Sequence, residues 1–433
     1  MEKTKVGIVG LGTVGSGVAK ILLDYSERTA RHAGRRRLWL EQVVVKDVKK
    51  ARDVVLPPGI LSDDLTRITR DPEIVAVAHL VGGLEPARTI MLQLLESGKD
   101  VITANKALLA EHGPELFDRA RQLGRTIAFE AAVAGGIPII ANISQCLSAN
   151  QILSLHGILN GTSNFILTAM ESSGQTYAQA VAEAQRLGYA EADPTLDVDG
   201  SDAAQKLAIL AHLAFGTRVH WNDIPKQGID NLKDADLQYA KELGHRIKLL
   251  AVAQLTDNGL ELHVSPTLVK VGSPLGEVHE AFNAVSVVGD AVGRIFFHGQ
   301  GAGQMPTASA VVADLIDTVV GRTAITFRTL EPWSKQDVAA KIVPHALCEG
   351  RYYLRFNVAD RPGVLADIAG SLGRQGISIA SVIQHETPDA QDASVPLVIM
   401  THNTTEGAVT RALAEIHTSQ AVSGPCVKLR VRT

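Results

Sequence analysis

The chain has few cysteines, no long apolar run and no large excess of charge of either sign. Its 433 residues include only three cysteines, Cys146, Cys348 and Cys426, which lie far apart. Such spacing and an odd number indicate neither a disulfide framework nor a zinc site. No stretch approaches the roughly 20 apolar residues that a membrane-spanning helix needs, and the first residues lack the pattern of a secretory signal. We therefore expect a cytoplasmic protein without a membrane partner.

The charge balance narrows the range of partners further. Lys and Arg number 42 against 46 Asp and Glu, which gives a net charge of −4. This balance gives no reason to expect nucleic acid or an anionic membrane as partner, so a small-molecule ligand is favoured. Hydrophobic residues make up 45% of the chain, and its length predicts two or three domains.

Short apolar runs alternate with helical patterns over residues 1–136. The runs are KVGIVG, VVVKD, AVAHLVGG, KDVITAN and TIAFEAA. This alternation is typical of an α/β fold, here a Rossmann-type, doubly wound parallel sheet. Residues 137–299 mix strands with long helices and predict an α+β second domain. Residues 300–322 are glycine-rich and then helical, and we expect them to return to the first domain.

The C-terminal part of the chain forms a pattern of its own. Residues 323–349 show little periodicity, which favours a linker. Residues 350–433 then show the order β-α-β-β-α-β, the ferredoxin-like arrangement. We therefore predict that residues 350–433 form a small third domain.

The segment VGIVGLGTVGSG places Gly10, Gly12 and Gly15 in G-x-G-x-x-G spacing between a strand and a helix. The first glycine allows a tight turn, the second lets a pyrophosphate approach, and the third lets helix and strand pack closely. A glycine turn that is merely tight is the alternative. We expect a dinucleotide to bind along Gly10, Leu11, Gly12, Thr13, Val14 and Gly15.

The choice between NAD and NADP depends on the end of the second strand. Lys46, Lys49 and Lys50 favour the additional phosphate of NADP, whereas Asp47 could bind the ribose of NAD. The sequence favours NADP and leaves NAD open. The preceding arginine-rich stretch, ERTARHAGRRR, is interpreted as a solvated loop.

The stretch YAEADPTLDVDGSDAAQK crowds five carboxylates, Glu191, Asp193, Asp197, Asp199 and Asp202, ahead of Lys206. Such a cluster is costly unless a cation lies within it, whether a metal ion, a substrate amine or the lysine. A helix from residue 201 would place the last aspartate and the lysine on one face, but a surface ion pair contributes only about 0.3–0.5 kcal/mol. A calcium loop would need a further acidic ligand and an incoming helix.

Six blocks of the sequence together carry a family resemblance. In order they are GLGTVG, VITANKALLA, EAAVAGGIP, GILNGTSNFIL, GYAEADPTLDVDGSDAAQKLAILA and GQGAGQMPTASAVVADL. The chain resembles homoserine dehydrogenases with a C-terminal ACT domain over nearly its whole length. The resemblance implies interconversion of L-homoserine and L-aspartate 4-semialdehyde with a nicotinamide cofactor, in threonine, methionine and isoleucine biosynthesis. His79 departs from the acidic residue usual in relatives, which bears on one contact near the cofactor.

The resemblance implies that residues 137–299 form the homoserine-binding domain, which serves catalysis and dimerisation. It also implies roles for individual residues. Lys106 and Lys206 are the expected catalytic residues, and Glu191, Asp197 and Asp202 are the expected substrate ligands. Chemistry agrees, because carboxylates suit the substrate's α-ammonium and an ammonium group can protonate the oxygen that hydride delivery leaves charged. Asp193 and Asp199 are assigned to turns and caps.

Further positions follow from the same resemblance. Thr103, Gly188 and Gly303 are expected near the cofactor. A monovalent cation, taken to be sodium, is expected to bind mainly backbone carbonyls of Glu130, Val133, Gly135 and Ile137. The ACT domain is expected to bind L-threonine near Asp360 and Gly363 and to favour a dimer or tetramer.

Two other functions stay open at this point. One is another Rossmann reductase of aldehydes or imines in amino-acid metabolism, and the other is a non-catalytic amino-acid sensor. An ACT domain that serves only dimerisation is also open. A sensor would not need both Lys106 and Lys206, and both are present.

Overall fold

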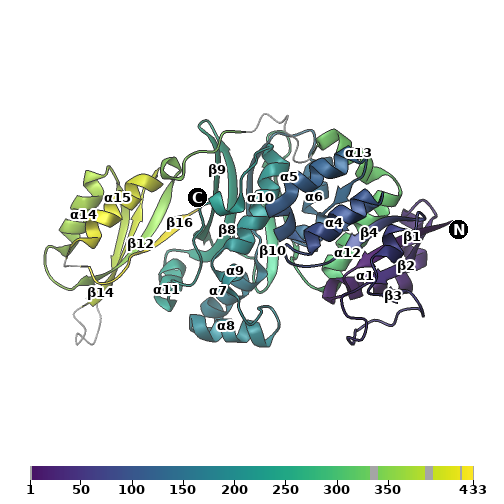
Figure 1. The fold of residues 1–433 in the computed structure, drawn as a ribbon. Helices are drawn as coiled ribbons and strands as arrows, with labels where there is room; N and C mark the ends of the chain where they lie inside the picture. The colour runs from purple at the N-terminus through teal and green to yellow at the C-terminus, as the bar shows by residue number, and fades with distance from the viewer. Residues whose placement is uncertain (1, 332–339, 386–393, 420–421, 433) are drawn as a thin grey trace. The chain divides into compact units, whose positions relative to one another are not determined.

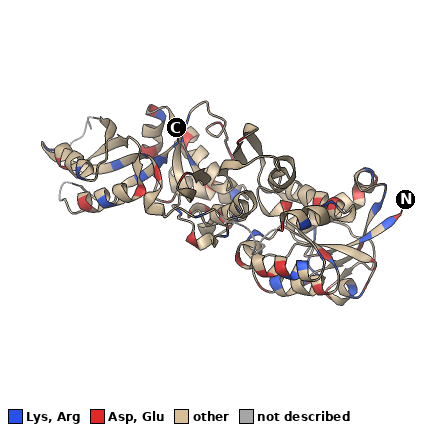
Figure 2. Cartoon of the chain, turned by 90° about the horizontal axis from the view of Figure 1, so that it is seen from above, with Lys and Arg blue, Asp and Glu red and all other residues tan. Residues whose placement is uncertain are grey.

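The computed structural model describes residues 2–331, 340–385, 394–419 and 422–432. The contacts divide the chain into two compact units. Unit 1 comprises Met1–Ile152, Gln205–Asp223 and Asn283–Ala340, and unit 2 comprises Leu153–Ala204, Ile224–Phe282 and Lys341–Thr433. Figure 2 shows basic and acidic residues interspersed along the helices of both units, as the small net charge suggests.

A helix that crosses a membrane requires sufficient length and apolar character. Within the described ranges, every helix is too short or too polar to cross a bilayer.

Unit 1 contains a parallel sheet with the strand order β3-β2-β1-β4-β5-β6. Its strands are β1 (Lys3–Val9), β2 (Arg37–Val44), β3 (Leu61–Ser62), β4 (Ile74–His79), β5 (Asp100–Thr103) and β6 (Ile127–Ala128). The order reverses between β1 and β4, and open α/β sheets bind ligands outside the carboxyl ends of the strands at this switch point. The predicted Rossmann-type sheet is confirmed.

The helices of unit 1 cover this sheet. They are α1 (Thr13–Asp24), α2 (Ser26–His32), α3 (Thr66–Thr69), α4 (Ala87–Glu96), α5 (Lys106–Gln122), α6 (Ile139–Ala141), α12 (Gln304–Val319) and α13 (Arg322–Leu330), with short turns η1 (Glu130–Ala132), η2 (Asn142–Cys146) and η3 (Trp221–Asp223). Helix α12 lies beside α1, and Val311 shares one buried core with Val18. A Cβ at Gly17 would lie 2.8 Å from the Gln304 carbonyl oxygen, so glycine permits the close approach. Residues 300–322 thus supply a helix to the nucleotide sheet.

The remaining elements of this region connect the two units along the chain. Strands β10 (Phe282–Gly289) and β11 (Gly293–Gln300) are neighbours in a sheet. Helix α10 (Ser201–Phe215) begins in unit 2 and continues in unit 1 after Ala204. Its bounds match the helical pattern SDAAQKLAILAHLAF, which is apolar on most of its surface and accordingly buried.

Unit 2 contains one sheet with the order β7-β8-β9-β16-β12-β14-β13, antiparallel except where β9 and β16 run parallel. Its strands are β7 (Ile152–Ile158), β8 (His245–Thr256), β9 (Gly259–Lys270), β12 (Glu349–Ala359), β13 (Ile379–Gln384), β14 (Ser394–Thr401) and β16 (Val427–Val431), and the short β15 (Thr404–Thr405) pairs with β12. The helices are α7 (Gly161–Ser173), α8 (Tyr177–Arg186), α9 (Thr195–Val198), α11 (Asp234–Glu242), α14 (Val364–Arg374), α15 (Glu406–His417) and the turn η4 (His345–Leu347).

The C-terminal part of unit 2 has the predicted ferredoxin-like order. Strands β12, β13, β14 and β16 alternate with α14 and α15, which cover one face of the sheet (Figure 1). Tyr352, Phe356, Ile368 and Val409 belong to its buried core. The segment PDAQDA at residues 388–393, whose composition predicts a turn between two strands, lies outside the described residues.

Two stretches differ from their expected conformations. The arginine-rich stretch was expected to be a loop, but it is helical over α2. The stretch 323–349 was expected to be a linker, but it contains α13 and η4. Residues 332–339 lie outside the described residues. Threonines at 323, 326 and 329 lower the intrinsic helix propensity of α13. Phe327 compensates by stacking on Phe117, with ring centroids 5.6 Å apart.

A buried ion pair joins α11 to the C-terminal domain within unit 2. Arg355 of β12 donates from Nε to Asp236 Oδ1 (2.6 Å) and from Nη2 to Oδ2 (3.0 Å), and Tyr353 Oη donates to Oδ1 (3.1 Å). The two charged side chains are 4% and 0% exposed. Removal of one member of such a pair leaves an uncompensated buried charge.

We expect Arg355→Met to lower the free energy of unfolding by about 3 kcal/mol or more, because Asp236 would stay buried without its cation. Urea unfolding followed by circular dichroism measures this change. Arg186→Met is the matched control, because Arg186 pairs with Glu183 on the surface and such pairs are worth at most about 1 kcal/mol. Equal effects of the two substitutions would contradict the assignment.

Candidate active site

The three glycines of the loop in unit 1 meet different steric requirements. Gly10 has φ of +96°, and a Cβ there would lie 2.6 Å from the Leu80 carbonyl oxygen. A Cβ at Gly15 would lie 2.2 Å from the Gly10 carbonyl oxygen. At Gly12, by contrast, no atom of the described chain lies within 4 Å of the Cβ position. The loop is therefore tight at its first and third glycines and open at the second, where a pyrophosphate needs room.

The surroundings of this loop fit a dinucleotide. Gly12 is the N-cap of α1, whose first residues are Thr13 and Val14, and Leu11 is buried at the base of the loop. The first N–H groups of a helix have no partner within the helix and attract phosphate. The loop also lies at the carboxyl end of β1, at the switch point of the sheet. These residues can hold the pyrophosphate of NAD or NADP.

The turn after β2 contains the residues that bear on cofactor choice. Lys46, Lys49 and Lys50 are exposed. Asp47 Oδ1 accepts a hydrogen bond from the Lys49 amide (2.8 Å), so this carboxylate stabilises its own turn. The exposed lysines leave the turn electropositive, which suits a phosphate better than a ribose hydroxyl.

The start of α5 is held in place by Asn105. Its Oδ1 accepts from the Leu108 amide (3.0 Å), and its Nδ2 donates to the carbonyl oxygens of Val81 (2.9 Å) and Gly83 (2.7 Å). Thr103 Oγ1 accepts from the Asn105 amide (3.1 Å). Lys106, the first residue of α5, thereby follows the carboxyl end of β5 in a fixed position. Asn105 was not predicted as a site residue, although its place before the helix is the signal of an N-cap.

His79, the position that departs from the family pattern, ends β4 and is fully buried. Burial lowers its pKa to about 4, so the imidazole is neutral at pH 7. A neutral ring therefore lies at the carboxyl end of β4.

The segment that contains the predicted cation ligands surrounds a buried carboxylate. Glu130 accepts hydrogen bonds from the amides of Ile140 and Ala141, both 2.8 Å, and its own amide donates to Asp314 Oδ2 (2.9 Å). Burial raises the pKa of Glu130 to about 7 and raises that of Asp314 well above its usual range. Both acids line a cavity of about 530 Å3 within unit 1.

The predicted cation site uses backbone carbonyls rather than side chains. Of the four expected ligands, Ile137 already accepts a hydrogen bond from the Ile139 amide (2.7 Å), whereas Val133 and Gly135 lie in the turn between η1 and α6. The described residues contain no group of three or more His, Cys, Asp or Glu side chains that could hold a metal ion. The carbonyl site stays a prediction.

In unit 2, Asn160 brings two of the predicted substrate ligands together. Its Nδ2 donates to Asp197 Oδ1 (2.7 Å) and to Asp202 Oδ2 (2.8 Å). Its Oδ1 accepts from the Ser163 amide (2.7 Å), which makes Asn160 the N-cap of α7. Asn160 and Asp202 are 4% and 5% exposed, whereas Asp197 is half-buried. A fixed donor shared by both carboxylates lowers the cost of holding them close together. Asn160 was missed as a site residue because LNGTSNF also fits an ordinary Asx turn.

The neighbouring residues of this motif tie the acidic stretch to α7. Ser163 Oγ donates to the Asp197 carbonyl oxygen (2.6 Å), and Thr162 Oγ1 donates to the Tyr189 carbonyl oxygen (2.6 Å). Glu191 follows in the same loop and is exposed, which leaves its carboxylate accessible to a ligand. Gly188 ends α8 with φ of +77°.

Asp193 and Asp199 have the predicted turn and capping roles. Asp193 Oδ1 accepts from the amide of Thr195 at the start of α9 (3.1 Å). Asp199 Oδ1 and Oδ2 accept from the amide (2.7 Å) and hydroxyl (2.9 Å) of Ser201 at the start of α10. Both carboxylates accept hydrogen bonds from backbone amides at the start of a helix, a role for which aspartate is favoured.

Lys206 lies four residues after Asp202 on α10, so the two side chains share a face of the helix. It is half-buried, whereas the other residues of the helix from Ser201 to Leu210 are buried. Gly303, a predicted cofactor contact, is the N-cap of α12 with φ of +129°.

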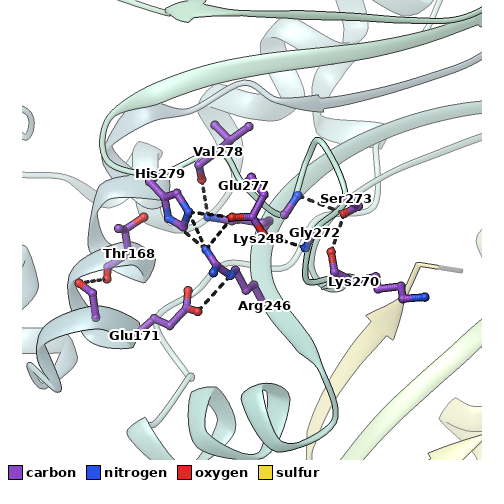
Figure 3. Close-up of polar contacts among 12 residues, drawn as sticks. Thr168, Glu171, Arg246, Lys248, Lys270, Gly272, Ser273, Glu277, Val278 and His279 are labelled. Atoms are coloured by element: carbon purple, nitrogen blue, oxygen red, sulfur yellow. Dashed lines mark hydrogen bonds and ion pairs between the residues drawn. The ribbon is translucent and has the colours of Figure 1, made fainter.

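Helix α7 also contacts a polar cluster at β8 (Figure 3). Lys248 is fully buried, and its Nζ donates to the Val278 carbonyl oxygen (2.5 Å) and to Asn164 Oδ1 (3.2 Å). Beside it, Arg246 lies within 3.5 Å of Glu171 and Glu277. Burial lowers the pKa of Lys248 to about 8. The cluster fixes the helix whose N-cap is Asn160.

The predicted effector residues lie where β12 meets α14. Gly363 is the N-cap of α14 with φ of +95°, and Asp360 is exposed in the preceding turn. A helix N-terminus of this kind can accept a carboxylate.

A Rossmann loop at the switch point, a lysine at a strand end and an acidic stretch followed by a helical lysine define the class. The chain carries the parts of a nicotinamide-dependent oxidoreductase with a C-terminal ferredoxin-like domain.

Comparison with known proteins specifies the family. Residues 138–316 match the model of homoserine dehydrogenase, residues 10–130 match the homoserine dehydrogenase NAD binding domain, and residues 352–418 match the ACT domain. The chain is 45% identical to the homoserine dehydrogenase of Pseudomonas aeruginosa, covering 100% of this chain and 99% of that protein. The chain belongs to the homoserine dehydrogenase family, and it is an oxidoreductase that acts on a CH–OH group.

Solved structures agree with this assignment. A homoserine dehydrogenase from Thiobacillus denitrificans has a TM-score of 0.91 at 43% identity and covers 100% of this chain and 99% of its own. A hyperthermophilic archaeal homoserine dehydrogenase in complex with NADPH has a TM-score of 0.60 at 25% identity, covering 73% of this chain and 97% of its own.

We expect Gly12→Ala to raise the KM for the nicotinamide cofactor at least tenfold without lowering the melting temperature. The added methyl group meets no atom of the described chain but occupies the space above the loop. Gly15→Ala provides the contrast, because its Cβ would meet the Gly10 carbonyl oxygen and should destabilise the fold. Cofactor titration and thermal unfolding distinguish the two, and an unchanged cofactor KM in Gly12→Ala would refute the assigned role.

The lowered pKa of Lys248 leads us to expect that the free energy of unfolding depends on pH. Its folded pKa of about 8 lies below the unfolded value of 10.5, so between these limits the unfolded state binds more protons and stability rises with pH. In Lys248→Met this contribution, on the order of 2–3 kcal/mol, should disappear. Urea unfolding at pH 7.5 and pH 9.5 measures the difference, with exposed Lys241→Met as control. Parallel pH profiles of the wild type and Lys248→Met would show the interpretation to be wrong.

Proposed function

We propose that the protein catalyses the reversible, NAD(P)-dependent interconversion of L-homoserine and L-aspartate 4-semialdehyde. The observation that carries the proposal is the pair Asp197 and Asp202 joined by Asn160, with Lys206 one helical turn further on. An amino-acid substrate needs carboxylates for its ammonium group and an acid for its reacting oxygen, and this stretch supplies both.

Each residue of the proposed mechanism acts on one part of the substrate. Glu191, Asp197 and Asp202 hold the α-ammonium, which relieves the repulsion among the carboxylates. The bound nicotinamide supplies hydride in reduction and accepts it in oxidation. Lys206 donates a proton to the aldehyde oxygen in reduction and removes one from the hydroxyl in oxidation, while the Lys106 ammonium stabilises charge on the substrate.

We also propose NADP as the favoured cofactor, with NAD as the alternative. The exposed Lys46, Lys49 and Lys50 beside the ribose end of the fold support this choice, as does the archaeal relative solved with NADPH. Lys46, Thr103, Lys106, Gly188 and Gly303 complete the proposed cofactor contacts.

A monovalent cation, sodium by preference, is proposed at the carbonyls of Glu130, Val133, Gly135 and Ile137. Ala134 has φ of +51°, so the backbone turns sharply within this segment, and oxygen ligands suit a hard cation.

The ACT domain is proposed to bind L-threonine at the turn containing Asp360 and Gly363 and to inhibit the enzyme. The supporting observation is the exposed N-terminus of α14, whose amides suit the effector's carboxylate. We further propose that the protein works in the cytoplasm as a homodimer or homotetramer.

The family and the lysines together favour this function over its alternatives. Another aldehyde or imine reductase would need a different arrangement for the substrate's ammonium group, and a non-catalytic sensor would need neither Lys106 nor Lys206. Both lysines are present: Lys106 is the first residue of α5, and Lys206 lies in the second turn of α10.

The decisive experiment follows homoserine oxidation through nicotinamide absorbance, with NAD and NADP compared side by side. We expect turnover by the wild type and a loss of at least a hundredfold in kcat for Lys206→Ala, with near-normal cofactor binding, because a lost acid–base group costs about 10²–10⁴ in rate. Lys241→Ala, a substitution of an exposed lysine on α11, is the control. No oxidation of homoserine by the wild type would overturn the proposed function, and an unchanged kcat in Lys206→Ala would remove this lysine from the chemistry.

A further inference from the structure

Residues 226–229, here called the connector, lie between strand β9 and the acidic stretch of unit 2. On one side, the Val264 amide of β9 donates to the Pro225 carbonyl oxygen and the Gln227 amide donates to the Val264 carbonyl oxygen, both at 2.9 Å. On the other side, the Ile229 amide donates to the Val198 carbonyl oxygen (2.8 Å). The connector therefore ties the end of α9 to the sheet.

Gly228 makes this contact unusually close. A Cβ at this position would lie 2.4 Å from the Val198 carbonyl oxygen and 2.8 Å from the Asp199 Cα. Real Cβ atoms do not approach backbone so closely, so any side chain would push the connector and residues 198–199 apart. These residues lie between Asp197 and Asp202, the two carboxylates that Asn160 holds.

Gly200 extends the contact toward the start of α10. It has φ of +87°, and a Cβ there would lie 3.2 Å from Val264 Cγ1 and 3.5 Å from the Gln227 carbonyl oxygen. The whole turn from Val198 to Gly200 thus rests on the connector and β9. The separation of the two substrate carboxylates depends on this support.

The connector also touches the last strand of the ACT domain. Gln227 Nε2 donates to the Lys428 carbonyl oxygen of β16 (3.1 Å). Strand β16 pairs with β9 at Arg430 and Thr267, and the Arg432 amide donates to the Leu268 carbonyl oxygen (2.9 Å). One side chain thereby joins the regulatory sheet to the support of the substrate ligands.

We infer that Gln227 and Gly228 are positioning residues that set the spacing of Asp197 and Asp202 and couple it to strand β16 of the ACT domain. The inference rests on the proposed function, in which these carboxylates hold the substrate's ammonium group. A change at the connector alters binding of the amino acid. It leaves binding of the nicotinamide cofactor as it was, because Gln227 and Gly228 contact residues of β9, β16 and the turn at 198–199, which are not the residues proposed to hold the cofactor.

Steady-state kinetics of the full-length enzyme test the positioning role. We expect Gly228→Ala to raise the KM for L-homoserine at least tenfold and Gln227→Met, which keeps the volume but removes the donor, to raise it at least threefold, with the cofactor KM within twofold of wild type in both. Gly373→Ala is the control, since α14 tolerates a methyl group that meets no atom of the described chain within 4 Å. General loosening of the fold would instead raise both KM values and lower the melting temperature.

Hydrogen exchange tests the coupling to the ACT domain, because linkage between two sites is reciprocal. We expect L-homoserine, added without cofactor, to slow amide exchange in residues 427–431 of the wild type and to have less effect in Gln227→Met. Unchanged exchange of β16 in the wild type would overturn the coupling, and an unchanged homoserine KM in both connector variants would overturn the positioning role. If Gly228→Ala does not fold, Gln227→Met alone decides. Failure of the proposed function would appear separately, as absence of homoserine oxidation by the wild type.

Discussion

The substrate half of the site depends on the side-chain amide of Asn160, which donates one hydrogen bond to each of two neighbouring carboxylates. Asp197 and Asp202 repel each other, and without a shared donor or a cation the pair would separate or take up a proton. The amide can act in this way because its oxygen caps α7 and because Lys248 of β8 holds the first turn of that helix through a hydrogen bond to Asn164. In the proposed mechanism, a substrate ammonium meets two acceptors that are already in position, so little ordering remains to oppose binding.

The nucleotide half of the site rests on a different constraint, the close approach of backbone to backbone. Gly10 and Gly15 are needed because a side chain would collide with carbonyl oxygens, whereas Gly12 is needed because the space above it must stay open for a ligand. The parallel sheet places this loop and the start of α5 at the carboxyl ends of their strands, where the switch point gathers ligand-binding loops. Asn105 then fixes the position of Lys106 through three hydrogen bonds.

The ACT domain and the strands beside the acidic stretch belong to one continuous sheet of unit 2. Strand β16 pairs with β9, and the buried Asp236–Arg355 pair anchors α11 to β12. The ACT domain is therefore built into the same hydrogen-bonded structure that supports the acidic stretch. Removal of residues 350–433 would expose an edge of β9 and leave Asp236 without its partner, so point substitutions separate regulation from folding more cleanly than truncation does.

The sequence by itself determined the Rossmann sheet, the ferredoxin-like C-terminal order, helix α10 and the family, because each depends on local periodicity or on short motifs whose spacing is directly readable. It also determined the capping roles of Asp193 and Asp199, since a side chain that bonds two residues away needs no distant partner. Tertiary structure alone decided the role of Asn160, whose partners lie 37 and 42 residues away, and the contact of Gly228 with Val198. It likewise decided that α13 is helical, because packing of Phe327 on Phe117 overrides the weak propensity of its threonines. Long-range hydrogen bonds and packing leave no periodic trace in a sequence, and for that reason these features became visible only in the fold.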